Sequence, residues 1–269
     1  MNRRQEFPGA VLYALIAIAT VVVFSAIFVV IHEHVHSTVA FLLGHMTSPF
    51  AIEWGTPVTL EGWAEGVSYS ALFAAGQGTD AAIIAVAPLV LHALIVIGGL
   101  YAMQSKALAK RKWIFHCVFW LVVVNLMELF SYMPVRAFAL HGDIGNINHG
   151  LGLSPWVLFL PGTALVLAGL YFLYGRVLPR MNVVVAGESR LIRYVILVFS
   201  AFVLFIERSS SHTALSVAPD MQWATSLFGY TAFVVVLWYC RPTMPWVAGA
   251  EEACRREIRG GDAGSLNLF

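Results

Sequence analysis

Six long apolar stretches constrain this chain more than any other feature of its sequence. A helix that crosses a bilayer needs about 20 mostly apolar residues, and only helices or closed barrels satisfy every backbone polar group in lipid. Charged residues make up 12% of the chain, against about 25% in an ordinary soluble domain. We therefore predict an all-α integral membrane protein with about six transmembrane helices. These run from residue 10 into the thirties and over Ala81–Met103, Trp113–Met133, Trp156–Tyr174, Leu191–Ile206 and Trp223–Cys240.

The basic residues predict how these helices are oriented. Cytoplasmic loops carry an excess of Lys and Arg, and all of the 16 basic residues except Arg136 and Arg208 lie in one alternating set of segments. Both termini are therefore expected in the cytoplasm. The first apolar stretch is longer than the apolar part of a signal peptide, so we expect a retained helix. The compact loops and the lack of an obvious organelle signal favour a bacterial inner membrane.

Two segments on the opposite side of the membrane are unusual. Residues 44–80 contain acidic residues but no Lys or Arg. Within them, Phe50–Trp54 and Val58–Leu60 have the pattern of short strands around a turn, which predicts a short β-hairpin or re-entrant segment between helices 1 and 2. Residues 136–155 are rich in Gly, Asn and His and are expected to form a polar loop. The chain from residue 241 onward is expected to be a short, solvated and partly disordered end.

The most informative motif is H-E-x-x-H, which begins at His32 and ends at His36. Residues four apart share one face of a helix, so both imidazoles can reach one metal ion, and Glu33 can take a proton from a water bound there. Zn²⁺ is the metal for which this spacing is typical. The plainer interpretation is a polar helix end that is simply hydrated at the headgroups. His34 lies on roughly the opposite face of the helix. It is expected to be exposed, or to contact a metal-binding side chain without binding the metal itself.

A catalytic zinc site has three protein ligands, and the third must come from another segment. The predicted topology places the end of helix 1 and the segment after helix 3 on the same side of the membrane. Asp143 in that segment is our preferred third ligand, because Gly142 beside it allows a sharp turn. His149 and His141 are the alternatives. A polar loop with an Asx-type turn would explain the same residues without a metal.

Other polar residues have predicted supporting roles. Asn125, Glu128 and Tyr132 share one face of the third helix, where Glu128 could bond a zinc-bound His or, equally, a neighbouring helix. His92 and His116 are expected to be hydrogen-bonded between helices. A donor to an oxyanion is also expected near the metal, and three residues after Asp143 are possible sources of it: Asn146, Asn148 and His149.

On these residues, the chain resembles the site-2 protease family of intramembrane metalloproteases. The likeness covers roughly residues 20–150. It comprises the H-E-x-x-H helix, the hairpin after it, the small residues of Ala74–Gln77 before helix 2 and the Asp-containing turn after helix 3. The family's usual Leu-Asp-Gly is here His141–Asp143, which reads His-Gly-Asp. The resemblance implies that the two His and the Asp hold Zn²⁺, that Glu33 is the general base, and that the hairpin offers a strand edge to an unwound substrate.

The resulting hypothesis is an intramembrane zinc metalloprotease-like hydrolase that cleaves membrane-spanning proteins. Residues 1–150 would form its metalloprotease-like core, residues 151–240 three additional transmembrane helices, and residues 241–269 a cytoplasmic tail. Two alternatives remain open: a non-proteolytic metal- or haem-binding membrane protein for transport or redox chemistry, and a zinc-dependent lipid amide hydrolase. The expected partners are a membrane protein substrate and the lipid bilayer. Nucleic acid is not expected, because no basic tract interleaved with aromatic residues occurs.

Overall fold

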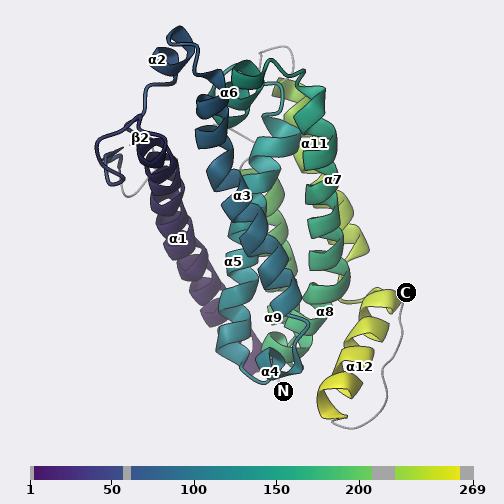
Figure 1. Ribbon diagram of the computed structural model, residues 1–269. Helices are drawn as coiled ribbons and strands as arrows, with labels where there is room; N and C mark the ends of the chain where they lie inside the picture. Colours follow the sequence, from purple (N-terminus) through teal and green to yellow (C-terminus); the bar gives the residue numbers. More distant parts are fainter. Residues whose placement is uncertain (1–2, 57–61, 208–221, 261–269) are drawn as a thin grey trace.

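The structure, a computed structural model, describes residues 3–56, 62–207 and 222–260. It is a bundle of helices with one short pair of strands (Figure 1). The first half comprises α1 (Arg3–Leu42), β1 (Ile52–Glu53), β2 (Ala64–Glu65), α2 (Tyr69–Ala74), α3 (Gly78–Ala102), α4 (Lys106–Ala109), α5 (Lys112–Phe130) and the π-helical turn η1 (Ser131–Val135). The second half comprises α6 (Gly142–Leu151), α7 (Trp156–Phe172), η2 (Leu173–Val177), α8 (Leu178–Met181), η3 (Asn182–Ala186), α9 (Arg190–Phe202), η4 (Val203–Glu207), α11 (Gln222–Tyr239) and α12 (Pro245–Arg259).

Four of the described helical segments are long and apolar enough to cross a membrane, as judged by length and composition. They are Glu6–Leu42, Gly78–Ala102, Lys112–Val135 and Trp156–Ala186, and they correspond to the first four predicted helices. The predicted helical fold class is therefore confirmed. The fifth predicted span corresponds to α9 and η4, and the sixth to α11. The count of six spans stays a prediction.

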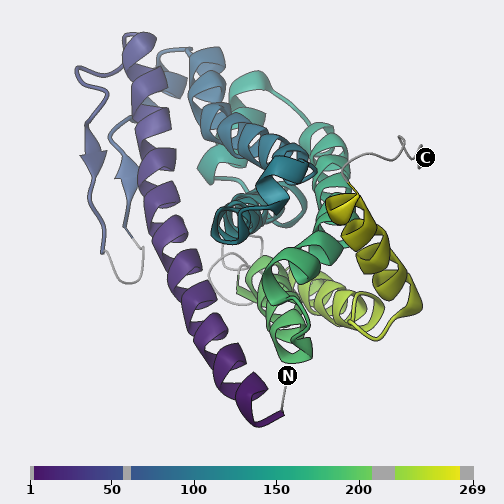
Figure 2. The ribbon, with the colours of Figure 1, turned by 90° about the horizontal axis from the view of Figure 1, so that it is seen from below.

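Helix α5 forms the centre of the bundle, and α1 lies at its edge. Trp120, Phe115 and Phe119 of α5 are fully buried, and the helix packs against α1, α3, α7 and η4. A helix that is apolar on all sides belongs in a core or in lipid. Most of α1, by contrast, is not covered by protein, and Leu12 and Leu15 on it are exposed. Figure 2 shows α1 running along one side of the bundle, with the strands outside it. Lipid is the solvent that suits such a face.

Helix α6 replaces the loop that we expected over residues 136–155. Ile144 and Ile147 lie one turn apart and bury their side chains against Ala82, Ala85 and Leu89 of α3. This apolar stripe stabilises the helix despite its polar composition.

Two glycines bring α6 and α3 into backbone contact. A Cβ atom added to Gly78 would lie 2.5 Å from the carbonyl oxygen of Gly150, and a Cβ on Gly150 would collide with the carbonyl of Gly78 in turn. Only glycine allows the two backbones to approach this closely. The contact fixes α6, and the residues it carries, at the end of the bundle where α1 ends and α3 begins (Figure 1).

The strand pair lies beside the last turns of α1. β1 and β2 are antiparallel, with Ile52 opposite Glu65 and Glu53 opposite Ala64. The first predicted strand contains β1. Its partner in the structure is β2, whereas the second predicted strand, Val58–Leu60, lies outside the described residues. The Ser37 hydroxyl donates to the carbonyl of Ala51 at 3.0 Å and ties the pair to α1.

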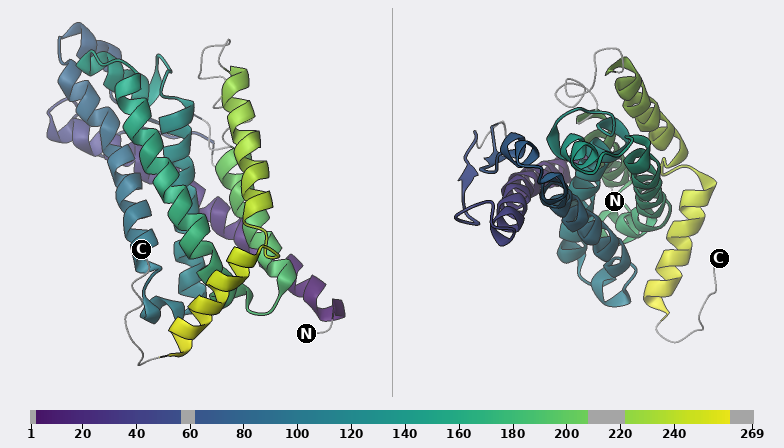
Figure 3. Two further views of the ribbon diagram at one scale, coloured as in Figure 1. Left: turned by 90° about the vertical axis from the view of Figure 1, so that its right-hand side faces the viewer. Right: turned by 45° about the horizontal axis from the view of Figure 1, so that its top comes forward.

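The expectation of a solvated, partly disordered C-terminal end is wrong for residues 245–259, which form α12. This helix lies at the end of the bundle where α1 begins (Figure 3). Its Glu251 is buried and lies 2.8 Å from the guanidinium of Arg193, and the amide of Asn182 donates to it at 2.9 Å. These polar contacts to neighbouring helices hold α12 in place, and a hydropathy pattern does not reveal such contacts. Residues 261–269 lie outside the described residues.

Candidate metal centre

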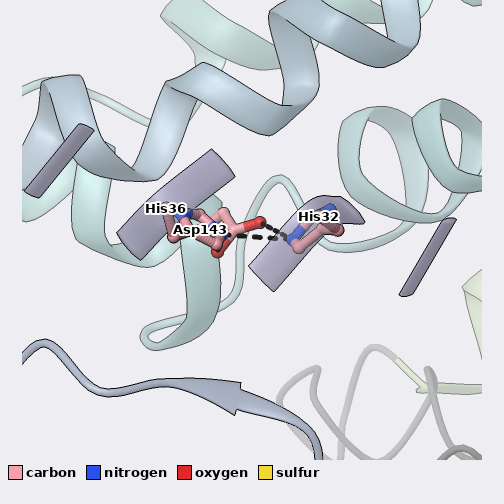
Figure 4. Close-up of side chains that lie close together, drawn as sticks. All are labelled: His32, His36 and Asp143. Atoms are coloured by element: carbon pink, nitrogen blue, oxygen red, sulfur yellow. Dashed lines mark hydrogen bonds and ion pairs between the residues drawn. The ribbon is translucent and has the colours of Figure 1, made fainter. Parts of the chain in front are cut away.

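Three side chains from two distant segments meet at one end of the bundle (Figure 4). The Nε2 atoms of His32 and His36, one turn apart on α1, are 3.1 Å from each other. Asp143, in the first turn of α6, places Oδ2 at 3.2 Å from Nε2 of His32 and Oδ1 at 3.3 Å from Nε2 of His36. His32 and Asp143 are each 7% exposed and His36 is 1% exposed. These three residues form a buried group that could hold a metal ion.

The backbone of α3 determines which nitrogen of His36 is free. Nδ1 of His36 lies 2.9 Å from the carbonyl oxygen of Ile84. A carbonyl oxygen only accepts, so Nδ1 carries a proton and Nε2 is the nitrogen that can bind an ion. Nε2 is also the nitrogen that faces Asp143 and His32. A ring held in this way through its other nitrogen is typical of metal-ligating histidines.

The spacing and the chemistry of the three residues fit a tetrahedral ion. Two ligand atoms bound at about 2.0–2.1 Å to a tetrahedral zinc ion are roughly 3.3 Å apart, and the three distances here are 3.1, 3.2 and 3.3 Å. Oδ2 of Asp143 is buried without a hydrogen-bond donor. A carboxylate whose oxygens lie between two imidazole nitrogens supplies the negative charge and the ligand atom that a divalent cation needs.

Glu33 lies on the side of His36 that faces the strand pair. Glu33, His36 and Glu65 of β2 bring their nitrogen and carboxylate atoms within 4.8 Å of one another. Oε2 of Glu33 is buried and has no hydrogen-bond partner. A buried carboxylate oxygen without a partner costs free energy unless something binds to it. The residue that the motif assigns as a base therefore has a free acceptor atom beside the group.

Two tyrosines flank the group. The ring of Tyr132 stacks on His32, with the centroids 5.7 Å apart, and its hydroxyl lies 3.4 Å from Nε2 of that residue. The hydroxyl of Tyr69, on α2, lies 3.5 Å from Nδ1 of His36. Burial and the charges of Glu65 and Asp143 raise the pKa of Tyr69 well above its usual range, so its hydroxyl keeps its proton.

The alternative third ligands are not part of the group. His141 and His149 are both exposed, and the ring of His149 lies against Phe73, with the centroids 4.3 Å apart. His34 points elsewhere as well. Its Nδ1 lies 2.8 Å from the carbonyl of Val30, and its ring lies near Phe50.

The predicted supporting residues differ in what they contact. Asn148 is buried, and its amide donates to the carbonyl of Ala137 at 3.3 Å. Asn146 is half-buried, and no hydrogen bond within the described part of the chain joins it to the group. Glu128 interacts electrostatically with His92 and Tyr132.

Sequence reasoning did not assign a role at this site to Glu65, Tyr69 or Ile84, and it treated His92 only as a packing residue. Glu65 carried one weak signal, as an acidic residue in a segment that contains no Lys or Arg. Ile84 contributes only its backbone carbonyl, which no sequence pattern can mark.

The chain matches no protein-family model, no curated protein and no solved structure.

Proposed function

We propose that this protein is an intramembrane zinc metalloprotease that cleaves peptide bonds of membrane-spanning proteins. The observation that carries the proposal is the buried group of His32, His36 and Asp143 with the unpartnered carboxylate oxygen of Glu33 beside it. A zinc ion held by the three residues would polarise a peptide carbonyl and activate a water molecule.

Each side chain then has a distinct task. His32, His36 and Asp143 bind the ion, and His36 is oriented by its bond to the carbonyl of Ile84. Glu33 accepts a proton at Oε2, which no other group occupies. The hydroxyl of Tyr132, 3.4 Å from a ligand nitrogen, is placed to donate to an oxygen on which negative charge develops.

The strand pair favours a peptide over other substrates. A transmembrane helix hides its carbonyl groups in its own hydrogen bonds, so it must become extended before it can be cleaved. An extended chain can add to the edge of a sheet through backbone hydrogen bonds. β2 carries Glu65, whose carboxylate lies in one cluster with Glu33, so a strand paired here would pass close to the base. A lipid amide lacks the repeating backbone N–H and C=O groups that pair with a strand edge.

The haem alternative has less support. Among the histidines that the structure describes, His92 and His116 lie between helices in the bundle, and each of their ring nitrogens already has a protein partner. His92 contacts His32 and Asn125, while His116 contacts Tyr13 and Thr20. A haem iron would need one of these nitrogens on each residue.

The test combines metal content with cleavage. Full-length protein is purified, analysed for bound metal and reconstituted with a library of tagged single-span proteins, and new termini are identified by mass spectrometry. We expect about one zinc ion per chain, and His36→Ala should weaken binding enough that the ion is lost during purification. Glu33→Gln should keep the zinc and abolish cleavage, whereas Glu53→Gln, an exposed glutamate of β1, should change neither. Cleavage retained in Glu33→Gln would refute the mechanism.

A further inference from the structure

A continuous chain of hydrogen bonds connects His32 to the middle of the bundle. Nδ1 of His32, on α1, lies 3.1 Å from Nε2 of His92, on α3. Nδ1 of His92 lies 2.7 Å from Oδ1 of Asn125, on α5. The side-chain amide of Asn125 in turn donates to the carbonyl of Leu121 at 2.8 Å. His92 is 1% exposed and Asn125 is fully buried, so water does not compete for these bonds.

The far end of the chain determines the position of every proton. A carbonyl oxygen only accepts, so the NH₂ group of Asn125 must face Leu121, because the reverse orientation would place two oxygens against each other. Oδ1 of Asn125 therefore faces His92, and Nδ1 of His92 carries the proton. His92 is buried, and burial disfavours the charged ring with two protons, so Nε2 of His92 accepts.

The protonation of His92 determines which nitrogen of His32 donates. Since Nε2 of His92 accepts, Nδ1 of His32 must donate, and Nε2 of His32 is the nitrogen left to bind the ion. This is the nitrogen that lies 3.1 Å from Nε2 of His36 and 3.2 Å from Asp143. The other possible tautomer would place a proton at this point and block metal binding.

We infer that His92 and Asn125 are positioning residues that hold His32 in the tautomer and ring orientation needed for metal binding. The inference rests on the proposed metal centre and extends it to two residues that touch no ligand atom of the ion. The two histidine ligands are thus held differently. His36 is anchored directly by a backbone carbonyl, whereas His32 depends on two side chains from α3 and α5.

The experiment measures the affinity of purified full-length protein for Zn²⁺ by competition with a chromophoric chelator. Asn125→Leu removes the acceptor at similar volume and should weaken binding by about 10- to 100-fold. Asn125→Asp keeps an acceptor oxygen toward His92, and in the neutral form that burial favours its hydroxyl replaces the amide as donor to Leu121, so it should restore most of the affinity. His116→Phe is the matched control, because His116 also bridges α1 and α5 through Tyr13 and Thr20 but does not contact the group. It should leave Zn²⁺ affinity within about threefold of the wild type, the scatter expected for a site it does not touch.

A double-mutant cycle separates positioning from general packing. If Asn125 acts through His32, Asn125→Leu should weaken Zn²⁺ binding in the His36→Ala background but have no effect in the His32→Ala background. An equal loss in both backgrounds would overturn the inference, as would an unchanged affinity in Asn125→Leu. Neither of these two results would contradict the proposed function. The proposed function fails instead if the wild-type protein binds no Zn²⁺.

Discussion

Asp143 lies 3.2 Å from Nε2 of His32, although the whole of α3 and α5 separates the two residues in the sequence. The contact joins α6 to α1, which is the least covered of the four described helices long enough to cross a membrane. A metal ion at this point would therefore link the two elements as well as serve chemistry. This makes the carboxylate of Asp143 the first target for mutation.

Asp143→Asn should weaken Zn²⁺ binding by roughly 100-fold or more, because a neutral amide replaces the only anionic ligand. The bundle should still form, since α6 is held to α3 by Ile144 and Ile147. Metal content after dialysis and the helical circular dichroism signal check the two expectations. Asp80→Asn is the matched control. Asp80 pairs with His45 at 2.8 Å, outside the group, and its loss should leave the metal in place.

Gly150→Ala should destabilise the protein by about 1–3 kcal/mol, because the added methyl group collides with the backbone of α3 at Gly78. The shift of α6 should also move Asp143 and lower Zn²⁺ affinity. Thermal unfolding in detergent and chelator competition provide the two measurements. Gly98→Ala, in α3 with open space around the added atom, should be neutral or slightly stabilising. Equal effects of the two substitutions would contradict the α3–α6 contact.

Tyr132→Phe should keep the bound zinc and lower the turnover of a cleaved reporter by about 100-fold, the cost of losing one donor to a developing oxyanion. The stacking of the ring on His32 survives in Phe, so only the hydroxyl is tested. Metal content and turnover are measured on the same preparation. Tyr101→Phe, at an exposed position of α3, is the control and should match the wild type. Full turnover in Tyr132→Phe would assign the oxyanion donor elsewhere.

Glu251→Ala should release α12 from the bundle. The substitution leaves the partly buried guanidinium of Arg193 and the amide of Asn182 without their acceptor, and breaking a buried pair in this way costs about 3–5 kcal/mol. Limited trypsin digestion should then cut α12 several times faster than in the wild type. Glu252→Ala removes an exposed partner, 3.9 Å from Arg256, and should leave the digestion rate unchanged.

Local patterns predicted some parts of this protein well. The first four spans could be located because their apolar length is a property of each segment alone. α12 and α6 were missed for the complementary reason. Their residues are polar, and the contacts that stabilise them, such as Glu251 with Arg193 and Ile144 with α3, come from distant parts of the chain.

The same division applies to the candidate metal centre. The spacing of His32 and His36 by itself determined that both imidazoles lie on one face of a helix, because helical periodicity is local. Only the tertiary structure decided that Asp143, and not His141 or His149, meets them, and that His92 and Asn125 stand behind His32. These pairings depend on how closely α3 approaches α6 and α5, and packing across the bundle sets that distance. The backbone contact of Gly78 with Gly150 is one example, because it determines where α6 and its side chains lie.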